Sequence, residues 1–279
     1  MRKSLLFIPA NQPGMLQNVD IFQADGIIFD LEDAVHLTEK DAARDLLKSF
    51  FNSVELKDVE AIVRIHHLDD IPAIINPRLD TICLPKADLE GLKKLNRALS
   101  TYERKYRLSK KIGVIALIET PESILNALAI AKAPRVNGIL LGGEDLSTSL
   151  HVMRTVEGKE IEFARNMVIY AAKSAEIDAI DTPFTNVEDN KGLETDILHA
   201  KALGMNAKAC IHPNQIELVN RLFMPSLTEI EFAKKVVIAM ENAEKQGLGA
   251  FTVDGKMVDQ PVITRALQVL KASEGYEDD

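Results

Sequence analysis

Aromatic residues are scarce in this 279-residue chain: it has no tryptophan and only 5% aromatic residues, although 46% of its residues are hydrophobic. The core must therefore be built mainly from Val, Ile, Leu and Ala, which is typical of parallel strands covered by helices on both faces. Cysteine is scarce as well. Cys83 and Cys210 both lie in apolar, strand-like runs, so we predict two buried, reduced thiols rather than a disulfide.

Other features are missing altogether. No apolar run approaches the ~20 residues of a membrane-spanning helix, and the apolar stretch near the start meets Pro9 and polar residues at once, which indicates a first strand rather than a signal peptide. The net charge of −9 disfavours nucleic acid as a partner. The Gly-x-Gly-x-x-Gly, P-loop and Gly-x-Ser-x-Gly motifs are absent. We therefore expect a cytoplasmic protein that binds neither nucleic acid nor a membrane.

Eight short apolar runs alternate with helical patterns along most of the chain. Continuous apolar runs of this length are typical of buried parallel strands. The alternation predicts an α/β fold, a (β/α)8 TIM barrel over residues 1–223. The predicted strands are Ser4–Pro9, Gly26–Leu31, Ala61–Ile65, Thr81–Pro85, Ile112–Glu119, Gly138–Gly142, Ala179–Asp181 and Ala207–Ile211. The main predicted helices are one that opens at Thr38–Asp41 in a capping-box-like start, Leu89–Tyr106, one from Pro121, Glu157–Ala175 and Glu188–Leu203.

The pattern changes after the eighth strand, and residues 224–279 read as a C-terminal appendage of helices and a hairpin. Pro225–Glu229 caps a helix that Gly247–Gly249 ends. An Asp-Gly pair, Asp254-Gly255, predicts a hairpin turn, and a last helix follows Pro261. This segment is large enough to cover a barrel mouth, its own or that of a neighbouring subunit.

Charged residues stand where the predicted strands end. Arg64 and Glu119 lie at the ends of two predicted strands and Asp145 lies just after a third, and the C-terminal ends of barrel strands converge on one mouth. Two carboxylates there predict a Mg²⁺ site, because Mg²⁺ takes one or two protein carboxylates and leaves other positions to water and substrate. The alternative is that both acids only favour the start of a helix. Gly142-Gly143 favours the metal, since glycine lets the backbone approach a ligand closely.

Arg64 also has two interpretations. An arginine at a strand end can bind a substrate carboxylate with two parallel hydrogen bonds, or it can pair with the acids of the neighbouring strand end, Asp30, Glu32 or Asp33. The histidines show no metal-ligand spacing, and His212 is interpreted as a structural hydrogen-bonding residue. Lys86, at the fourth strand end, lies in no context that singles out a Schiff-base lysine.

An ordered series of motifs resembles the citrate lyase β-subunit family, the HpcH/HpaI-like acyl-thioester lyases. No single piece is decisive, but the series runs through nearly the whole chain at family spacing. The matching segments are Arg2–Pro9, Phe29–Val35 with Lys40 and Arg44, Val63–Ile65, Leu84–Lys86, Leu117–Pro121, Leu141–Leu146, Ile180–Asp181, Gly204 with Lys208, Ile211–Ile216 and Gly255–Asp259.

The resemblance implies roles for several residues. Glu119 and Asp145 would bind Mg²⁺, through which Glu119 also takes part in substrate binding, and Arg64 would bind the carboxylate end of the substrate. Asp259 would take part in proton transfer, from an appendage that reaches over the active site of a neighbouring subunit in a homotrimer or larger assembly. Basic residues near the mouth would meet the phosphates of coenzyme A or of a carrier-protein phosphopantetheine; the candidates are Arg2, Lys3, Lys40 and Lys86.

The reaction that the resemblance implies is retro-aldol cleavage of a β-hydroxyacyl thioester, with citryl-CoA or a citryl carrier protein giving oxaloacetate and an acetyl thioester. Malyl-CoA or citramalyl-CoA cleavage, a malyl-CoA thioesterase and a non-autonomous subunit of a citrate lyase complex remain alternatives. Two departures lie beside Arg64, where many relatives have asparagine at the position of His66 and Trp-Gly in the connection at 67–72. A third departure is Ala207 before Lys208, where glycine is common in the family, and its effect should be mild.

Overall fold

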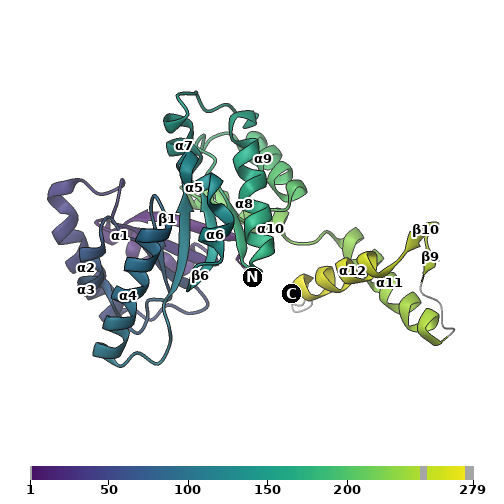
Figure 1. The fold of residues 1–279 in the computed structure, drawn as a ribbon, viewed down its shortest axis with the longest axis horizontal. Coiled ribbons are helices and arrows are strands. Elements are labelled where there is room, and N and C mark those ends of the chain that lie inside the picture. The colour runs from purple at the N-terminus through teal and green to yellow at the C-terminus, as the bar shows by residue number, and fades with distance from the viewer. Residues whose placement is uncertain (1, 246–249, 274–279) are drawn as a thin grey trace. The chain divides into compact units, whose positions relative to one another are not determined.

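Eight parallel strands form a closed barrel in the computed structural model, which describes residues 2–245 and 250–273 (Figure 1). Each strand pairs with its successor in the chain, and β8 closes the barrel against β1. The predicted TIM-barrel fold is confirmed. The strands are β1 (Ser4–Pro9), β2 (Gly26–Asp30), β3 (Glu60–Arg64), β4 (Thr81–Leu84), β5 (Gly113–Ile118), β6 (Val136–Leu141), β7 (Asp178–Asp181) and β8 (Ala207–Cys210).

Aliphatic side chains fill the barrel, as the shortage of aromatic residues predicts. One buried cluster takes members from all eight strands, and the aromatic side chain of Phe7 packs against it. Its members are Leu5, Ile28, Ile62, Cys83, Ile115, Leu117, Leu140, Ile180, Ala207 and Ala209. Small residues on β8 leave room for the large ones opposite, so that a barrel of this size is packed rather than hollow.

Several strands end one residue earlier than the apolar runs predicted, because the chain leaves the sheet there and enters the loops that form the mouth. The backbone hydrogen bonds continue one step beyond the strands: Leu31 N donates to Arg64 O at 2.9 Å, and Gly142 N donates to Ile118 O at 2.9 Å. Residues just past the strands are therefore held as firmly as the strands themselves. This is the position that Glu119 occupies after β5.

The helices that cover the barrel start from side-chain caps in several cases. Asp88 accepts a hydrogen bond from Gly91 N at the start of α4, and Thr120 forms a capping box with Ser123 at α5. Thr38 does not cap α2 as expected: its hydroxyl bonds the ring of His36, which caps a preceding 3₁₀ turn. The helices of the barrel are α1 (Pro13–Leu16), α2 (Lys40–Ser53), α3 (Ile71–Ile74), α4 (Leu89–Tyr106), α5 (Pro121–Leu125), α6 (Ala127–Ala131), α7 (Gly143–Ser149), α8 (Glu162–Ser174), α9 (Asn190–Leu203) and α10 (Ile216–Phe223).

The N-terminal end of the barrel is filled by an ion cluster around Arg2. Its guanidinium pairs with Glu60 at the start of β3, at 2.5 Å, and with Asp178 at the start of β7, at 2.8 Å. Lys3 pairs with Asp25, directly before β2. Arg2 and Lys3 therefore lie at the opposite end of the strands from the mouth. The expectation that they meet phosphates at the mouth is wrong, because both are held by acids at the strand starts.

The structure divides into two compact units, residues 2–220 and the residues from Arg221 onward. The second unit contains α11 (Leu227–Lys245), the antiparallel strands β9 (Phe251–Val253) and β10 (Lys256–Val258), and α12 (Gln260–Ser273). Asp254 and Gly255 form the turn with φ angles of 47° and 75°, as an Asp-Gly hairpin requires. The predicted helix end at 247–249 and the tail at 274–279 lie outside the described residues.

Ser226 and Glu229 form the capping box predicted at the start of α11, with Ser226 N donating to Glu229 Oε2 at 2.7 Å. The unit has its own small core, in which α11 and α12 enclose the hairpin. Its buried members are Ala233, Val236, Val253, Val258, Ile263 and Ala266.

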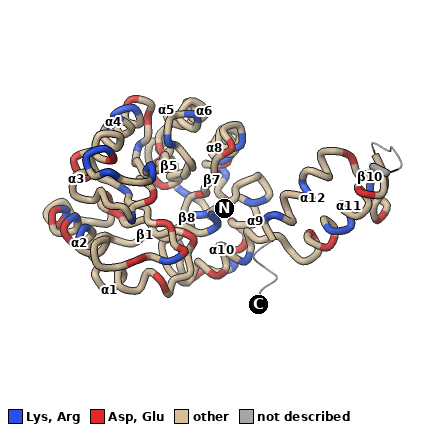
Figure 2. The backbone as a smooth tube through the Cα atoms, turned by 90° about the horizontal axis from the view of Figure 1, so that it is seen from below, with Lys and Arg blue, Asp and Glu red and all other residues tan. Residues whose placement is uncertain are grey.

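The expectation about the two cysteines is met. Cys83 and Cys210 are free and buried, and burial raises the pKa of the Cys210 thiol to about 12. None of the described helices has the length and apolarity needed to cross a membrane. Basic and acidic residues are interspersed over the barrel helices, as Figure 2 shows, whereas α12 contains basic residues and no acidic one.

Candidate active site

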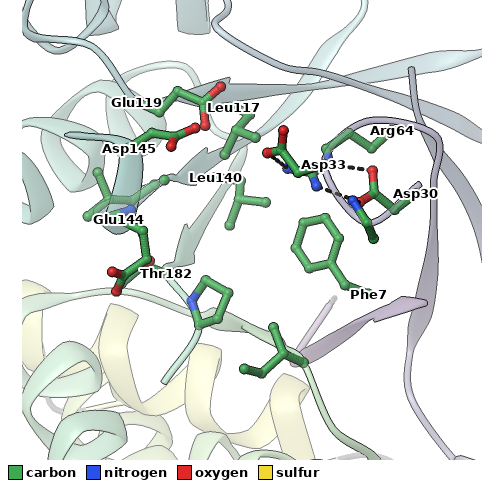
Figure 3. A pocket seen from close by; sticks show the side chains of 16 residues that line it. Phe7, Asp30, Asp33, Arg64, Leu117, Glu119, Leu140, Glu144, Asp145 and Thr182 are labelled. Atoms are coloured by element: carbon green, nitrogen blue, oxygen red, sulfur yellow. Dashed lines mark hydrogen bonds and ion pairs between the residues drawn. The ribbon is translucent and has the colours of Figure 1, made fainter. Parts of the chain in front are cut away.

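A cavity of about 390 Å³ opens where the barrel strands end. Leu117 and Leu140 line its floor. Glu119 and Asp145 lie on one side of it, and Arg64 lies on the other (Figure 3). The three residues predicted from the strand ends thus share one cavity, as convergence of the strands at the mouth requires.

Glu119 is a buried carboxylate with little compensation. It follows β5 directly, is 2% exposed, and accepts a hydrogen bond from the backbone N of Lys86 at 2.6 Å. Burial, together with the negative charges of Glu32 and Asp145, raises its pKa to about 8, although the Lys86 hydrogen bond acts in the opposite direction. Negative charge in this position favours a bound cation or a bound proton.

Lys86 presents its backbone to Glu119 through an uncommon conformation. Its φ angle is 45°, in the left-handed region that few non-glycine residues adopt. Its ammonium lies 3.3 Å from Glu32 Oε1, and the side chain is 60% exposed. Burial lowers the pKa of Lys86, but the charge and hydrogen bond of Glu32, together with the charges of Glu119 and Asp145, outweigh it, so that the net shift is upward. Lys86 is therefore an exposed, charged group at the mouth.

Asp145 stands in the first turn of α7, which begins one residue after Gly142. The two glycines before it have a different purpose from the close ligand approach expected. A Cβ on Gly142 would lie 2.6 Å from Glu119 Cβ, and a Cβ on Gly143 would lie 2.9 Å from Thr182 Oγ1. Both glycines thus make room for neighbouring side chains. They bring the start of α7 close to the buried Glu119.

Arg64 pairs with the acids that follow β2, as one of its two interpretations holds. Its Nε and Nη2 donate to the two carboxylate oxygens of Asp30, at 2.6 and 2.5 Å, and its Nη1 lies 3.1 Å from Glu32 Oε2. The guanidinium also lies over the ring of Phe7, at 5.0 Å. Burial lowers the pKa of Arg64, but the hydrogen bonds and charge of Asp30, with the charge of Glu32, raise it by more. The net shift is upward, so the guanidinium stays charged. Binding of a substrate carboxylate would have to use the Nη1 side.

Lys40 has no capacity left for a phosphate. It is 6% exposed, and its ammonium donates to the backbone oxygens of Leu31, Glu32 and Val35, at 2.7, 2.7 and 3.1 Å. These three bonds use all three donors of the ammonium. Its assignment to cofactor binding is therefore corrected: Lys40 orders the loop that carries the acids after β2.

Other predicted residues take local positions. His212 accepts from Asn214 N, in agreement with a structural histidine. His66, beside Arg64, is exposed, and its backbone N donates to Asp70. Asp259 precedes α12 in the second unit, where Val262 N donates to its Oδ1 at 3.4 Å. Its role in proton transfer stays a prediction.

Sequence reasoning missed Thr182 and Glu144, which also line the cavity. Glu144 pairs with Arg154 at 3.1 Å. Thr182 is 1% exposed and follows β7 directly. Its position at the C-terminal end of a strand was the available signal, since Arg64, Glu119 and Asp145 also lie at or near strand ends.

Among the residues that the structure describes, no group of three or more His, Cys, Asp or Glu side chains is arranged to hold a metal ion. The candidate site is instead a carboxylate pair, Glu119 and Asp145, that interacts electrostatically on one side of the mouth. Two carboxylates are a normal protein contribution to a Mg²⁺ site. The raised pKa of Glu119 is a second reason why a cation fits here.

Comparison with known proteins identifies the family. The model of the HpcH/HpaI aldolase/citrate lyase family matches residues 3–213. The chain belongs to this family. It is 39% identical to the citrate lyase subunit beta of Leuconostoc mesenteroides subsp. cremoris, over 97% of this chain and 93% of that protein. It is 33% identical to a (3S)-malyl-CoA thioesterase of Cereibacter sphaeroides (strain ATCC 17029 / ATH 2.4.9), over 98% of this chain and 94% of that protein. The family resemblance seen in the sequence is confirmed.

Solved structures agree with the fold of this family member. The crystal structure of CitE from Mycobacterium tuberculosis in complex with magnesium, acetoacetate and coenzyme A has a TM-score of 0.80 and 29% identity, and the match covers 98% of each chain. A citrate lyase beta subunit from M. tuberculosis complexed with oxaloacetate and magnesium has a TM-score of 0.68 and 28% identity, over 80% of this chain and 97% of that one.

We expect a divalent cation such as Mg²⁺ to bind more tightly as the pH rises toward 8. Below the Glu119 pKa of about 8 a proton competes with the cation for this carboxylate. The dissociation constant, measured by titration calorimetry on the substrate-free protein, should fall by up to about tenfold per pH unit between about pH 6 and pH 8. Glu119→Gln should bind weakly at every pH, whereas Glu122→Gln, a control at the exposed start of α5, should match the unmodified chain. A pH-independent constant would contradict this account.

Proposed function

We propose that this chain is a Mg²⁺-dependent carbon–carbon lyase that cleaves a citryl thioester into oxaloacetate and an acetyl thioester. The observation that carries the proposal is the polarity of the cavity, with the buried Glu119 beside Asp145 on one side and Arg64 on the other. In a substrate with a hydroxyl and a carboxylate on one carbon, the hydroxyl would face the side of Glu119 and Asp145, and the carboxylate would face Arg64. The citrate lyase relatives support this substrate class.

Glu119 and Asp145 would hold Mg²⁺. When bound, the cation would supply Lewis-acid stabilisation to the hydroxyl oxygen as its proton leaves. Glu119 would also take part in placing the substrate, through that shared cation. The remaining steps, in which the carbon–carbon bond breaks and the acyl-thioester fragment becomes an enolate, need a fixed substrate and a proton donor.

Arg64 would fix the substrate. Its Nε and Nη2 are taken by Asp30, so a substrate carboxylate would bind the Nη1 side in place of Glu32. A held carboxylate sets the direction of the breaking bond, which is where orientation lowers a barrier most. The pairing with Asp30 supports this role, because it locks the guanidinium in one orientation.

Asp259 would protonate the enolate, from an appendage (residues 224–279) that covers the active site of a neighbouring subunit. This part of the proposal rests on the family resemblance, since the hairpin β9–β10 beside Asp259 already packs against α11 and α12 within its own unit. A general acid supplied by a neighbour would make the homotrimer, or a larger assembly, a condition for activity.

The natural thiol would be coenzyme A or a carrier protein in the cytoplasm, and Lys86 is the basic residue retained for its phosphates. Its ammonium is exposed at the mouth and charged. If the chain works only inside a lyase complex with a carrier protein, free CoA thioesters will be poor substrates.

The second candidate is a malyl-CoA thioesterase, which the thioesterase relatives favour. The same cavity would then direct water to the thioester carbonyl. The two activities differ in product, because a lyase releases an oxo-acid and a thioesterase releases the intact hydroxy-acid.

A panel of citryl-, malyl- and citramalyl-CoA with Mg²⁺ tests the proposal. We expect oxaloacetate and acetyl-CoA from citryl-CoA, and loss of activity with a chelator or in Asp145→Asn. Release of free malate or citrate would favour the thioesterase, and full activity with chelator present would refute a metal-dependent lyase. Inactivity on every CoA thioester, followed by cleavage of a carrier-protein thioester, would assign the chain to a complex.

Arg64→Lys should lower kcat/KM by a factor equivalent to about 2–5 kcal/mol, because an ammonium cannot replace the planar guanidinium. Asp30→Asn is the matched variant: it disturbs the same ion pair but keeps the arginine, so it should lose less. Measured kinetics near those of the unmodified chain in Arg64→Lys would show that Arg64 is only a structural partner of Asp30.

Asp259→Asn should turn over slowly while it still binds Mg²⁺ and thioester, since only proton transfer is lost. Mixing this variant with Glu119→Gln under conditions of subunit exchange should restore part of the activity, because some mixed assemblies contain one intact composite site. Asp254→Asn, in the hairpin turn, is the control. If mixed assemblies form and remain inactive, the neighbour model is refuted.

A further inference from the structure

Two residues of the family-like motifs, Asp181 and Lys208, have no role in the proposed chemistry. They meet in a buried group of four charges. Lys208 Nζ lies 2.6 Å from Asp181 Oδ2 and 2.6 Å from Asp196 Oδ2. Arg165 donates to the same two aspartates, at 2.8 Å to Asp181 and 2.6 Å to Asp196. We call Arg165, Asp181, Asp196 and Lys208 the charge quartet.

The charge quartet ties several layers of the barrel together. Asp181 ends β7 and Lys208 lies on β8, while Arg165 belongs to α8 and Asp196 to α9. Arg165, Asp181 and Lys208 are 0% exposed. Two positive and two negative charges balance, which is the condition under which buried charges are tolerated. Such a group is rigid, because moving any member would leave a buried charge unpaired.

The charge quartet fixes the residue that follows it. Lys208 Nζ donates its third hydrogen bond to the backbone oxygen of Thr182, at 2.7 Å. The side chain of Thr182 in turn accepts from the backbone N of Gly143, at 3.0 Å. Gly143 is the first residue of α7, and Asp145 is in the same turn. A continuous path of short contacts thus joins the charge quartet to the helix that carries Asp145.

We propose that Thr182 is a positioning residue for the metal site. Lys208 holds its backbone oxygen, while its hydroxyl accepts from Gly143 N and so fixes the start of α7 and the position of Asp145 relative to Glu119. The close fit supports this role, since a Cβ on Gly143 would lie 2.9 Å from Thr182 Oγ1 and 3.2 Å from its Cγ2. The inference rests on the proposed Mg²⁺ site at Glu119 and Asp145. Residues that orient ligands in this way change metal affinity by about 10- to 100-fold when they are altered.

Thr182→Val removes the hydroxyl and keeps the shape. Titration calorimetry with Mg²⁺ alone, without substrate, should show a dissociation constant about 10- to 100-fold higher than that of the unmodified chain. Thr182→Ser keeps the acceptor and should restore most of the affinity. The matched control is Thr81→Val, a second buried threonine, which bonds Glu60 at the opposite end of the barrel. It should lower the melting temperature and leave Mg²⁺ affinity unchanged.

Gly143→Ala separates positioning from direct contact. It leaves the Thr182 hydroxyl intact but pushes α7 away from it, so Mg²⁺ affinity should fall here too. If Thr182 acted by touching the metal or its water, Gly143→Ala would bind normally, and the inference would be overturned. This variant also provides the test if Thr182→Val does not fold.

The outcomes distinguish the inference from the proposed function. If the unmodified chain binds Mg²⁺ no better than Glu119→Gln, the proposed metal site itself fails. Suppose instead that the unmodified chain binds Mg²⁺ through Glu119, and that Thr182→Val, Thr81→Val and Gly143→Ala all bind Mg²⁺ as tightly as the unmodified chain. The metal site then stands, and the positioning role of Thr182 is refuted.

Discussion

The burial of Glu119 is the constraint on which the mouth of this barrel depends. Its carboxylate is withdrawn from water, accepts a backbone hydrogen bond from Lys86, and stands near two further acids. Three features accommodate it. Lys86 adopts a left-handed backbone conformation, and Gly142 has no Cβ that would collide with Glu119. The hydrogen bond from Gly143 N to Thr182 fixes the start of α7. On the far side Arg64 pairs with Asp30 and lies near Glu32 and Asp33. One side of the cavity therefore holds a cation among acids, and the other holds Glu119 and Asp145.

The barrel and the three main site residues could be predicted from the sequence. Buried parallel strands are continuous apolar runs, so their positions are visible without knowledge of contacts between distant segments. Convergence of the strand ends then brings Arg64, Glu119 and Asp145 together. The fold and the family are confirmed by the relatives, while the roles of these residues remain to be tested.

The errors have a common physical origin. The charge and position of Lys40, Arg2 and Lys3 predict phosphate binding, but the partners of a long cationic side chain are decided by distant segments. Lys40 meets three backbone oxygens, and Arg2 meets acids that start β3 and β7. For the same reason the charge quartet could not be found, since its members come from two strands and two helices far apart in the sequence. Local pattern shows where a charge stands, not what it pairs with.

The ion cluster around Arg2 also has a consequence for how ligands move. It occupies the N-terminal end of the barrel, and aliphatic side chains fill the interior above it. Within residues 2–245 and 250–273, access to the cavity is then through the mouth. If the substrate is a thioester as proposed, its small acid end would enter first and the thiol arm would follow. The oxo-acid fragment beside Arg64 would then lie beneath the acyl thioester, so release would be ordered, with the thioester leaving before the oxo-acid.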